Sequence, residues 1–206
     1  HGPYRSPADK PRSFSHEGRQ EIPLNRVPRY TRLKEDPTDG LRYIDRYDEE
    51  IAYMDREVGR LLDEYKTAGL VENTIFIFTA DHGETMTDAD RYFTHGYDTL
   101  EPVMRVPLAV RRPGNPDGVS TQPVSTMDIA PSVLAWLGLP VPTYMDGFPL
   151  GDRPPEAPVS LEATSRKKQI RAAISGNRKW TVRRDAQGKE QSRQTGQFRE
   201  TDSPLE

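Results

Sequence analysis

Two adjacent residues, Asp81 and His82, are the side chains best suited to chemistry in this sequence. A carboxylate and an imidazole can both ligate a divalent cation. The pair directly follows residues 74–80, a run rich in Ile, Phe and Thr that predicts a strand covered on both faces. Open α/β sheets bind their ligands at the carboxyl ends of such strands. Gly83 would let the backbone turn sharply where a substrate approaches closely.

Two further histidines are candidates for the same site. His95 follows His82 by thirteen residues, and it could bind an anionic group or protonate a leaving oxygen near neutral pH. His1 is a third candidate donor, although a terminal residue is usually mobile. Each signal also has a structural interpretation, because an Asp-His-Gly tripeptide can be an ordinary turn and a lone histidine is usually structural. Adjacent ligands supply only half of a metal site.

The segments before these residues predict the elements that position them. Asp36 and Pro37 predict the start of a helix, and Gly69 predicts its left-handed cap. Between them, apolar residues at spacings of three and four predict one apolar stripe, formed by Ile44, Tyr47, Ile51, Met54, Val58, Leu61 and Tyr65. Residues 1–35 predict an irregular segment or a disordered arm.

The segments after the candidate residues predict a loop, a strand, a helix and a small sheet. Residues 85–100 predict a functional loop, and 105–110 a strand in which Pro107 marks an edge or a bulge. Residues 125–128 have the form of a capping box, which predicts a helix from Ile129 to Leu137 with a kink or a restart at Pro131. Three short runs predict a small antiparallel sheet, namely 159–163, 170–175 and 179–182.

Composition excludes several classes of protein. The 206 residues are 33% hydrophobic and 30% charged, with 19 prolines, so we expect the core mainly within residues 41–150. A net charge of -3 suggests neither nucleic acid nor an anionic membrane as a partner, and no segment is apolar enough for a membrane span. The absence of cysteine excludes disulfides but leaves localisation open between the periplasm, the exterior and the cytoplasm.

Taken in order, these segments resemble the sulfatases, a family of the alkaline phosphatase superfamily. Residues 43–62 resemble the helix before the family's metal strand, and Thr79-Ala80-Asp81-His82-Gly83-Glu84 is similar to its second metal-binding motif. Thr94-His95-Gly96 with Arg105-Val106-Pro107-Leu108 matches the stretch that follows that motif. Residues 124–134 resemble the next helix. The resemblance covers residues 41–150 well, and its ordered combination of motifs is more specific than any one of them.

The resemblance implies an α/β fold with a mixed, mostly parallel sheet flanked by helices, alkaline-phosphatase-like but incomplete, and a small C-terminal antiparallel β subdomain. We expect a partial catalytic domain over 1–150, the subdomain over 151–190 and a disordered tail over 191–206. The implied reaction is hydrolysis of a sulfate ester, for example on a sulfated carbohydrate, at one divalent cation. Asp81 and His82 would bind that cation, with Ca²⁺ as first choice and Mn²⁺ as the alternative. His95 and His1 would contact the sulfate or the leaving oxygen.

The sequence also departs from the family pattern. The family's nucleophile is a formylglycine made from Cys or Ser in a Cys/Ser-x-Pro-x-Arg motif, which is missing here together with the paired aspartates that complete the metal site. Both belong upstream of His1, so we expect a C-terminal portion that is inactive alone and binds metal weakly. Tyr97-Asp98 stands where many members have a lysine. Alternatives are a phosphodiesterase, phosphonate monoester hydrolase or phosphoglycerol transferase of the same superfamily, and a non-catalytic remnant or binding module.

Overall fold

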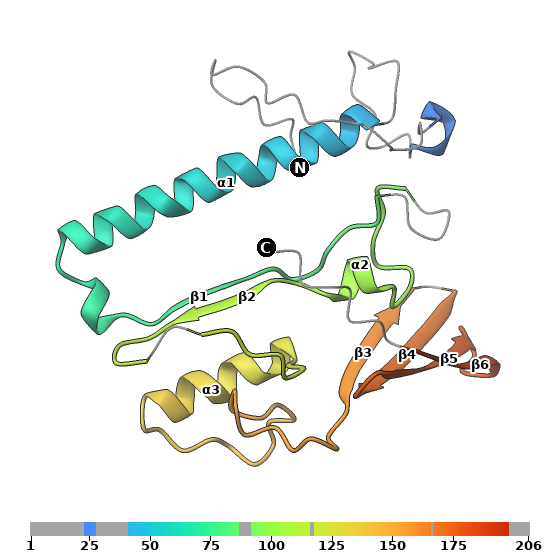
Figure 1. Cartoon of the computed structure of the whole chain (residues 1–206). Coiled ribbons are helices and arrows are strands. Elements are labelled where there is room, and N and C mark those ends of the chain that lie inside the picture. Colours follow the sequence, from blue (N-terminus) through green and yellow to red (C-terminus); the bar gives the residue numbers. More distant parts are fainter. Residues whose placement is uncertain (1–22, 28–40, 87–91, 116–117, 166, 198–206) are drawn as a thin grey trace. The chain divides into compact units, whose positions relative to one another are not determined.

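The computed structural model describes residues 23–27, 41–86, 92–115, 118–165 and 167–197 (Figure 1). The chain divides into two compact units, His1–His95 with Glu101–Pro116 and Gly96–Leu100 with Asp117–Glu206. The predicted domain boundary at residue 150 stays a prediction.

The elements are η1 (Leu24–Arg26), α1 (Leu41–Thr67), η2 (Val71–Asn73), β1 (Phe76–Thr79), α2 (Glu101–Met104), β2 (Leu108–Arg111), η4 (Thr126–Asp128), α3 (Ile129–Trp136), β3 (Val159–Thr164), β4 (Lys168–Ser175), β5 (Arg178–Asp185) and β6 (Glu190–Gln197). Within the described ranges, no helix has the length and apolar character needed to cross a membrane.

The helix α1 ends as its sequence predicts. Gly69 has a φ of +70°, in the left-handed region that favours glycine. Its N–H donates to the Lys66 carbonyl at 3.1 Å, and the Leu70 N–H donates to the Tyr65 carbonyl at 2.9 Å. This pair of hydrogen bonds is a Schellman motif, which satisfies carbonyls at the helix end and turns the chain towards β1. The predicted start at Asp36 and Pro37 lies outside the described residues.

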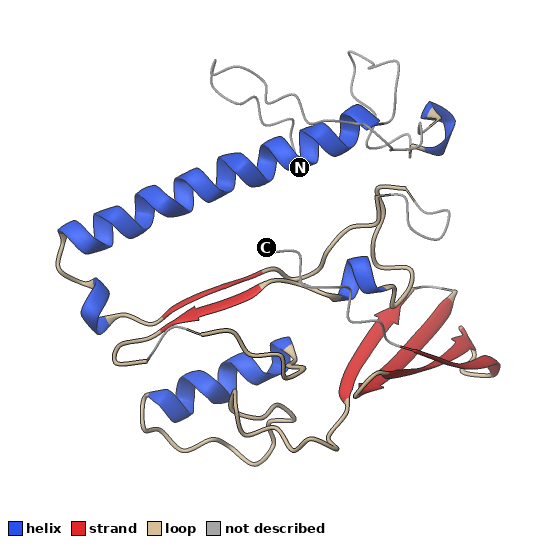
Figure 2. Cartoon of the chain, viewed as in Figure 1, coloured by secondary structure: helices blue, strands red, loops and turns tan. Residues whose placement is uncertain are grey.

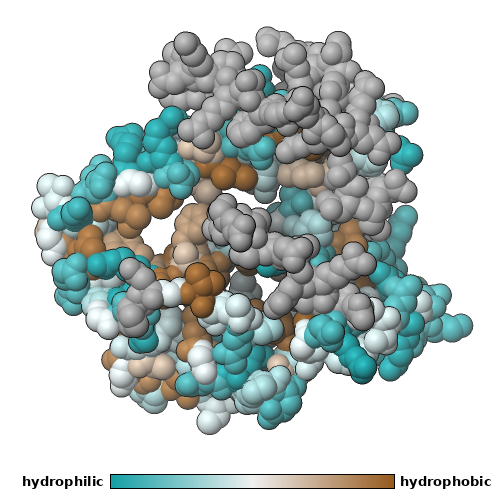
Figure 3. All heavy atoms as spheres, in the orientation of Figure 1, coloured by the Kyte–Doolittle hydropathy of each residue, from teal (hydrophilic) through white to brown (hydrophobic). Residues whose placement is uncertain are grey.

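The apolar stripe of α1 is in contact with other described elements mainly near its ends. Tyr43 is buried beside Val27 and Phe93, and the Tyr43 and Phe93 ring centroids are 5.6 Å apart. At the other end, Tyr65 packs edge-on against Phe76 of β1, with centroids 5.2 Å apart. Between these contacts, the stripe is 38–50% exposed at Tyr47, Ile51, Met54 and Leu61. Apolar atoms of this helix are accordingly visible at the surface in Figure 3.

The strand predicted at 74–80 is present as β1, which pairs antiparallel with β2 from Phe76↔Arg111 to Thr79↔Leu108. Two expectations for it are wrong in the described structure. Both described sheets are antiparallel, not mostly parallel. Between β1 and β2 the chain has only the one-turn helix α2, whereas parallel strands need a longer crossover helix. β1 is also not covered on both faces, because the adjacent residues Phe78 and Thr79, whose side chains point to opposite faces, are both exposed.

The start of β2 and its link to η2 follow from two residues near the strand ends. β2 begins at Leu108, directly after Pro107, because proline has no N–H to donate to a ladder. At the other end of β2, the Arg111 guanidinium donates to the Val71 carbonyl at 2.7 Å and to Glu72 Oε1 at 3.1 Å. These bonds join η2, which precedes β1, to the end of β2.

In the second unit, the predicted capping box is confirmed. The Ser125 Oγ accepts from the Met127 N–H at 3.3 Å, and Asp128 Oδ2 accepts from the Ser125 N–H at 2.9 Å. Pro131 lies in the first turn of α3, directly after η4, where its missing N–H costs no helical hydrogen bond. Of the two alternatives that the sequence left open at Pro131, a kink or a restart, the structure contains a restart, from η4 to α3.

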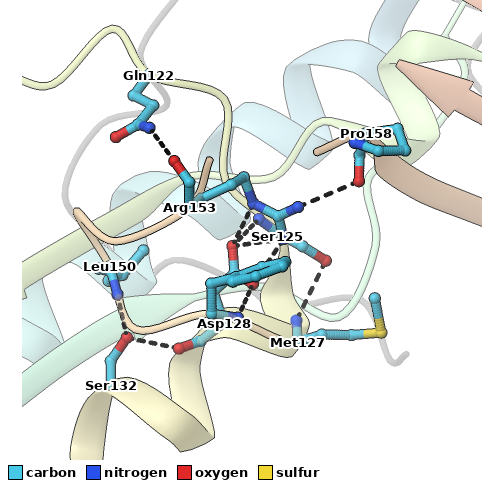
Figure 4. Close-up of polar contacts among 9 residues, drawn as sticks. Gln122, Ser125, Met127, Asp128, Ser132, Leu150, Arg153 and Pro158 are labelled. Carbon is cyan, nitrogen blue, oxygen red and sulfur yellow. Dashed lines mark hydrogen bonds and ion pairs between the residues drawn. The ribbon is translucent and has the colours of Figure 1, made fainter. Parts of the chain in front are cut away.

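Asp128 is also the centre of a buried polar network (Figure 4). Its carboxylate is 1% exposed and accepts from Arg153 Nη2 at 2.7 and 2.9 Å and from Arg153 Nε at 3.1 Å. The Phe148 N–H donates to Asp128 Oδ1 at 2.9 Å, and Arg153 Nη1 donates to the Pro158 carbonyl at 3.1 Å. One ion pair thus joins the start of α3 to the segment that leads into β3.

The predicted C-terminal sheet is confirmed as β3-β4-β5-β6, with all neighbours antiparallel (Figure 2). Its buried residues are Val159, Ala163, Ile170, Ala172, Ile174 and Thr181, so part of the core lies outside the expected range 41–150. β6 occupies residues 190–197, where the sequence predicted a disordered tail from 191. This strand buries little apolar surface and is held by the β5 ladder and by Arg183 Nη1 donating to Gln194 Oε1 at 2.7 Å. Residues 198–206 lie outside the described ranges.

Candidate functional site

The turn that carries the predicted site begins two residues after β1 and is fixed by α2. The Gly83 N–H donates to the Val103 carbonyl at 2.7 Å. A Cβ added to Gly83 would lie 2.0 Å from the Pro102 carbonyl oxygen, a distance that real Cβ atoms do not show. Glycine is therefore required at this position by the close approach of the α2 backbone, whereas the sequence had suggested a close approach of substrate.

Asp81 and His82 lie close enough to act together. Asp81 Oδ2 is 3.7 Å from His82 Nε2, and Asp81 Oδ1 accepts from the His82 backbone N–H at 2.9 Å. His82 Nδ1 is 2.8 Å from the Gly83 carbonyl oxygen. A carbonyl only accepts, so Nδ1 carries the proton and Nε2 has the lone pair that a metal needs.

The donor set fits part of a metal site. Both side chains are accessible, with Asp81 88% and His82 40% exposed, and two atoms 3.7 Å apart can share one cation at bond lengths of about 2.0–2.6 Å. Across the described part of the chain, however, no cluster of three or more His, Asp or Glu side chains could hold a metal. The pair supplies two ligands, whereas Ca²⁺ and Mn²⁺ require more.

His95 lies beside this pair. Its ring stacks on the His82 ring, with centroids 4.0 Å apart and planes at 27°. His95 Nδ1 is 3.0 Å from Glu84 Oε2. Sequence reasoning assigned no role to Glu84, although an acidic residue two positions after His82, in the same turn, was a visible signal.

A short bridge brings Glu84 and His95 together. Thr85 and Thr94 form an isolated antiparallel pair, in which Thr85 Oγ1 donates to the Thr94 carbonyl at 2.6 Å and the Thr94 N–H donates to Thr85 Oγ1 at 3.2 Å. Thr85 is 1% exposed. Next to the bridge, the buried Phe93 has a φ of +51°, which costs a non-glycine residue about 1–2 kcal/mol. Thr85 and Thr94, two positions of the predicted loop 85–100, are therefore held in a defined conformation.

The negative charge of Glu84, in this turn, acts on Tyr47 of α1. Burial, and next the negative charge of Glu84, raise the pKa of the Tyr47 phenol, with Asp48 and Glu50 contributing in the same direction. The Glu84 carboxylate is therefore close enough to α1 for its charge to act on Tyr47.

Asp98, in the segment where the resemblance leads one to expect a lysine, has a structural role. Arg183 Nη2 of β5 lies 3.3 Å from Asp98 Oδ1, and Lys179 Nζ donates to the Thr99 carbonyl. Asp98 Oδ1 also accepts from the Thr99 N–H at 2.9 Å. The segment after His95 is therefore held by basic side chains of β5.

Of the predicted site residues, the structure brings together Asp81, His82 and His95, while His1 lies outside the described residues. The arrangement offers an anionic oxygen and two imidazole rings at one strand end. Such a set can bind a cation and can exchange a proton with a bound oxyanion.

Comparison with known proteins relates this chain to one family of enzymes. The family model described as Sulfatase matches residues 1–139 of this chain. Human N-sulphoglucosamine sulphohydrolase is 31% identical over 163 residues, which is 70% of this chain and 31% of that protein. Endo-4-O-sulfatase of Bacteroides thetaiotaomicron is 31% identical over 151 residues, or 71% of this chain and 29% of that protein.

Two further similarities support less, because the first covers less of this chain and the second has a low sequence identity. Choline-sulfatase of Rhizobium meliloti is 29% identical over 89 residues, 43% of this chain and 17% of that protein. A solved structure of a protein in complex with its substrate D-glucosamine-2-N,6-O-disulfate has a TM-score of 0.55 at 21% identity, and the match covers 68% of this chain and 31% of that one. It shows a similarity of fold. The chain spans between 17% and 31% of the length of these curated relatives.

Proposed function

The chain belongs to the sulfatase family of the alkaline phosphatase superfamily, and from this premise we propose that it takes part in metal-dependent hydrolysis of a sulfuric ester. The fold of its parent is proposed to be alkaline-phosphatase-like. The observation that carries the proposal is the convergence of Asp81 Oδ2, His82 Nε2 and the His95 ring on one turn after β1.

In this proposal, Asp81 and His82 bind one divalent cation, with Ca²⁺ as first choice and Mn²⁺ as the alternative. When bound, the cation would act as a Lewis acid that polarises the sulfate oxygens. The hydrogen bond from His82 Nδ1 to the Gly83 carbonyl keeps the lone pair on Nε2, beside the Asp81 carboxylate. His95 contacts the sulfate or gives a proton to the leaving oxygen, and His1 is proposed for the same role on the resemblance alone.

The chain does not contain every group that the reaction requires. It has no cysteine and no serine in the Cys/Ser-x-Pro-x-Arg motif, so none of its residues can carry a formylglycine. We propose that other segments of a longer parent supply the nucleophile and the remaining metal ligands, and that the present residues alone are inactive and bind metal weakly. The extent of the matches, at most 31% of the reported relatives, supports this view.

The proposed substrate class is sulfated carbohydrate. Of the relatives described above, the two that cover the largest share of this chain are named for sulphoglucosamine and for an endo-acting 4-O-sulfatase. The solved structure of similar fold holds a glucosamine disulfate. The choice of sugar depends on loops, which vary independently of the scaffold that carries them.

The first experiment tests the metal ligands in the chain itself. Mn²⁺ is titrated into the ¹⁵N-labelled chain, and we expect paramagnetic broadening centred on residues 81–84 that saturates only at high metal concentration. Asp81→Asn should abolish the broadening, whereas Asp63→Asn, on an exposed position of α1, should leave it unchanged. Tight, stoichiometric binding of Ca²⁺ by the wild-type chain would contradict the proposal that ligands are missing.

The second experiment tests the reaction. The product of the complete reading frame that encodes this chain is assayed with para-nitrophenyl sulfate, a phosphate diester and a phosphonate monoester. We expect sulfate ester hydrolysis that falls at least 100-fold in Asp81→Asn and in His82→Ala, since removing one group that stabilises transition-state charge costs about 10²–10³ in kcat. Preference for the phosphate diester or the phosphonate would assign the protein to a different branch of the superfamily, and activity towards none of them would favour a non-catalytic role.

A further inference from the structure

We propose that Glu84 is a positioning residue that holds His95 as its Nδ1–H tautomer, so that Nε2 is the nitrogen presented to the substrate. The contact behind this inference is the 3.0 Å distance between His95 Nδ1 and Glu84 Oε2. The presentation of Nε2 to a sulfate ester rests on the proposed function, whereas the tautomer of the free chain does not.

The backbone makes Glu84 and His95 direct neighbours. Thr85 and Thr94 are paired antiparallel, and the residue before one member of such a pair faces the residue after the other member. Glu84 and His95 occupy those two positions. Their contact is therefore a cross-strand pair set by the bridge, with side chains at a separation that favours interaction.

Glu84 is itself held in place. Its Oε1 accepts from the Thr85 N–H at 3.1 Å while Oε2 faces His95, so each carboxylate oxygen has a partner. The Glu84 side chain is 19% exposed, compared with 43% for His95. A carboxylate fixed by a backbone donor in this way orients the imidazole, because the more buried and better anchored partner sets the geometry of the pair.

The chemistry of a carboxylate fixes the direction of this hydrogen bond. An ionised carboxylate can only accept, so Nδ1 must donate in both the neutral and the protonated imidazole. In the neutral ring the single proton is then on Nδ1, and the lone pair is on Nε2. Hydrogen bonds to a charged acceptor are about twice as strong as neutral ones, which favours this tautomer over the alternative.

The neighbouring ring has the same arrangement by another route. His82 Nδ1 faces the Gly83 carbonyl at 2.8 Å, so its tautomer is set by the backbone rather than by Glu84. The two stacked rings thus both have Nδ1 as donor and Nε2 as the nitrogen with the lone pair. Because a change at Glu84 should alter His95 but not His82, His82 serves as a reference within the same spectrum.

The alternative interpretation is an ordinary exposed ion pair. Such pairs contribute about 0–1 kcal/mol to stability, so a measurement of unfolding cannot separate the two interpretations. The tautomer can separate them, since a pair without a positioning role would leave the proton distributed between both nitrogens once the ring is neutral.

The test is a long-range ¹H–¹⁵N correlation spectrum of the ¹⁵N-labelled chain at a pH where the imidazoles are neutral. The ring signals are assigned with His95→Gln and His82→Gln. For wild-type His95 we expect Nδ1 to carry the proton and Nε2 to show the shift of an unprotonated ring nitrogen. In Glu84→Gln the amide can donate as well as accept, so we expect loss of the single tautomer and a mixture at His95.

Two further variants complete the design. Glu84→Asp keeps an acceptor-only carboxylate on a shorter stem, and should retain more of the Nδ1–H tautomer than Glu84→Gln does. Glu72→Gln makes the same chemical change in a glutamate that is paired with Arg111, and should leave His95 as in wild type. Amide signals of Thr85 and Thr94 report whether the bridge persists in each variant.

The wild-type spectrum alone can overturn the inference, so a variant that fails to fold does not remove the test. A proton on His95 Nε2 in the wild-type chain, or a folded Glu84→Gln variant with an unchanged tautomer, would refute it. A correct tautomer in a chain that shows no Mn²⁺ broadening would refute the proposed metal ligands and leave the role of Glu84 intact. Mn²⁺ broadening at residues 81–84 together with a proton on His95 Nε2 would refute the role of Glu84 and leave the proposed metal ligands intact.

Discussion

Replacing Arg153 with methionine should destabilise the second unit by about 3–5 kcal/mol, the usual cost of removing one partner from a buried ion pair. Arg153 and Asp128 have side chains only 6% and 1% exposed, so water cannot take the place of the lost partner. Since small domains have unfolding free energies of about 5–15 kcal/mol, this loss is a large fraction of the total.

The magnitude follows from the bonds that remain in the variant. Asp128 loses three contacts to the guanidinium, at 2.7, 2.9 and 3.1 Å. It keeps the backbone N–H donors of Ser125 and Phe148, each at 2.9 Å. Methionine fills a similar volume, so the expected cost is that of an uncompensated buried charge rather than that of a cavity.

Urea unfolding followed by tryptophan fluorescence measures this cost. The chain has two tryptophans, Trp136 and Trp180, and both belong to the second unit. Arg153→Lys should fall between wild type and Arg153→Met, because lysine keeps the charge but not the planar fork.

A matched control exists in the same unit. Arg171 pairs with Glu162 at 3.2 Å on an exposed part of the sheet, with side chains 58% and 47% exposed. Arg171→Met should therefore cost less than about 1 kcal/mol. If Arg153→Met and Arg171→Met destabilise the unit equally, the argument that burial gives the Asp128 pair its importance is refuted.

Three further predictions concern the first unit. Gly83→Ala should displace the turn from α2, because its Cβ would meet the Pro102 carbonyl oxygen, and should abolish Mn²⁺ broadening at His82. Gly59→Ala, on an open face of α1, should stabilise the unit by about 0.5–1 kcal/mol in urea unfolding followed by circular dichroism. Because burial and the Glu84 charge raise the pKa of Tyr47, the folded chain keeps that phenolic proton when the unfolded chain has lost it, and stability should fall as pH rises above about 10.

Each of these has a simple check. Unchanged broadening in Gly83→Ala would mean that the turn tolerates a shift of α2. A loss of helix signal in Gly59→Ala would imply a contact on that face of α1. In an ultraviolet titration, Tyr47→Phe should remove a phenolate transition that lies above pH 10, the usual tyrosine value, and removal of a transition at or below that pH would contradict the raised pKa.

Features set by local sequence were predicted well. The spacing of apolar residues predicted α1, and Gly69 predicted its cap, because only glycine adopts that conformation at little cost. The sequence of residues 125–128 predicted the hydrogen bonds between Ser125 and Asp128, since a capping box involves only four consecutive residues. The juxtaposition of Asp81 and His82 was predicted because neighbouring residues need no tertiary contact to meet.

Features that depend on distant parts of the chain were missed. Arg153 reaches Asp128 from 25 residues away, and no periodic pattern marks either partner. The contact between Glu84 and His95 requires the Thr85–Thr94 bridge, and a polar loop sequence does not predict such a bridge. β6 was missed because composition measures what a segment can bury, whereas this strand is held by backbone pairing with β5.

The Thr85–Thr94 bridge also has a consequence for how this region can change. Four hydrogen bonds among Thr85, Phe93 and Thr94 hold the two chain segments together, so the spacing of Glu84 and His95, just outside the bridge, is set by these bonds. Substitutions that spare Thr85, Thr94 and the buried Phe93 beside them should therefore leave Glu84 and His95 at the same spacing.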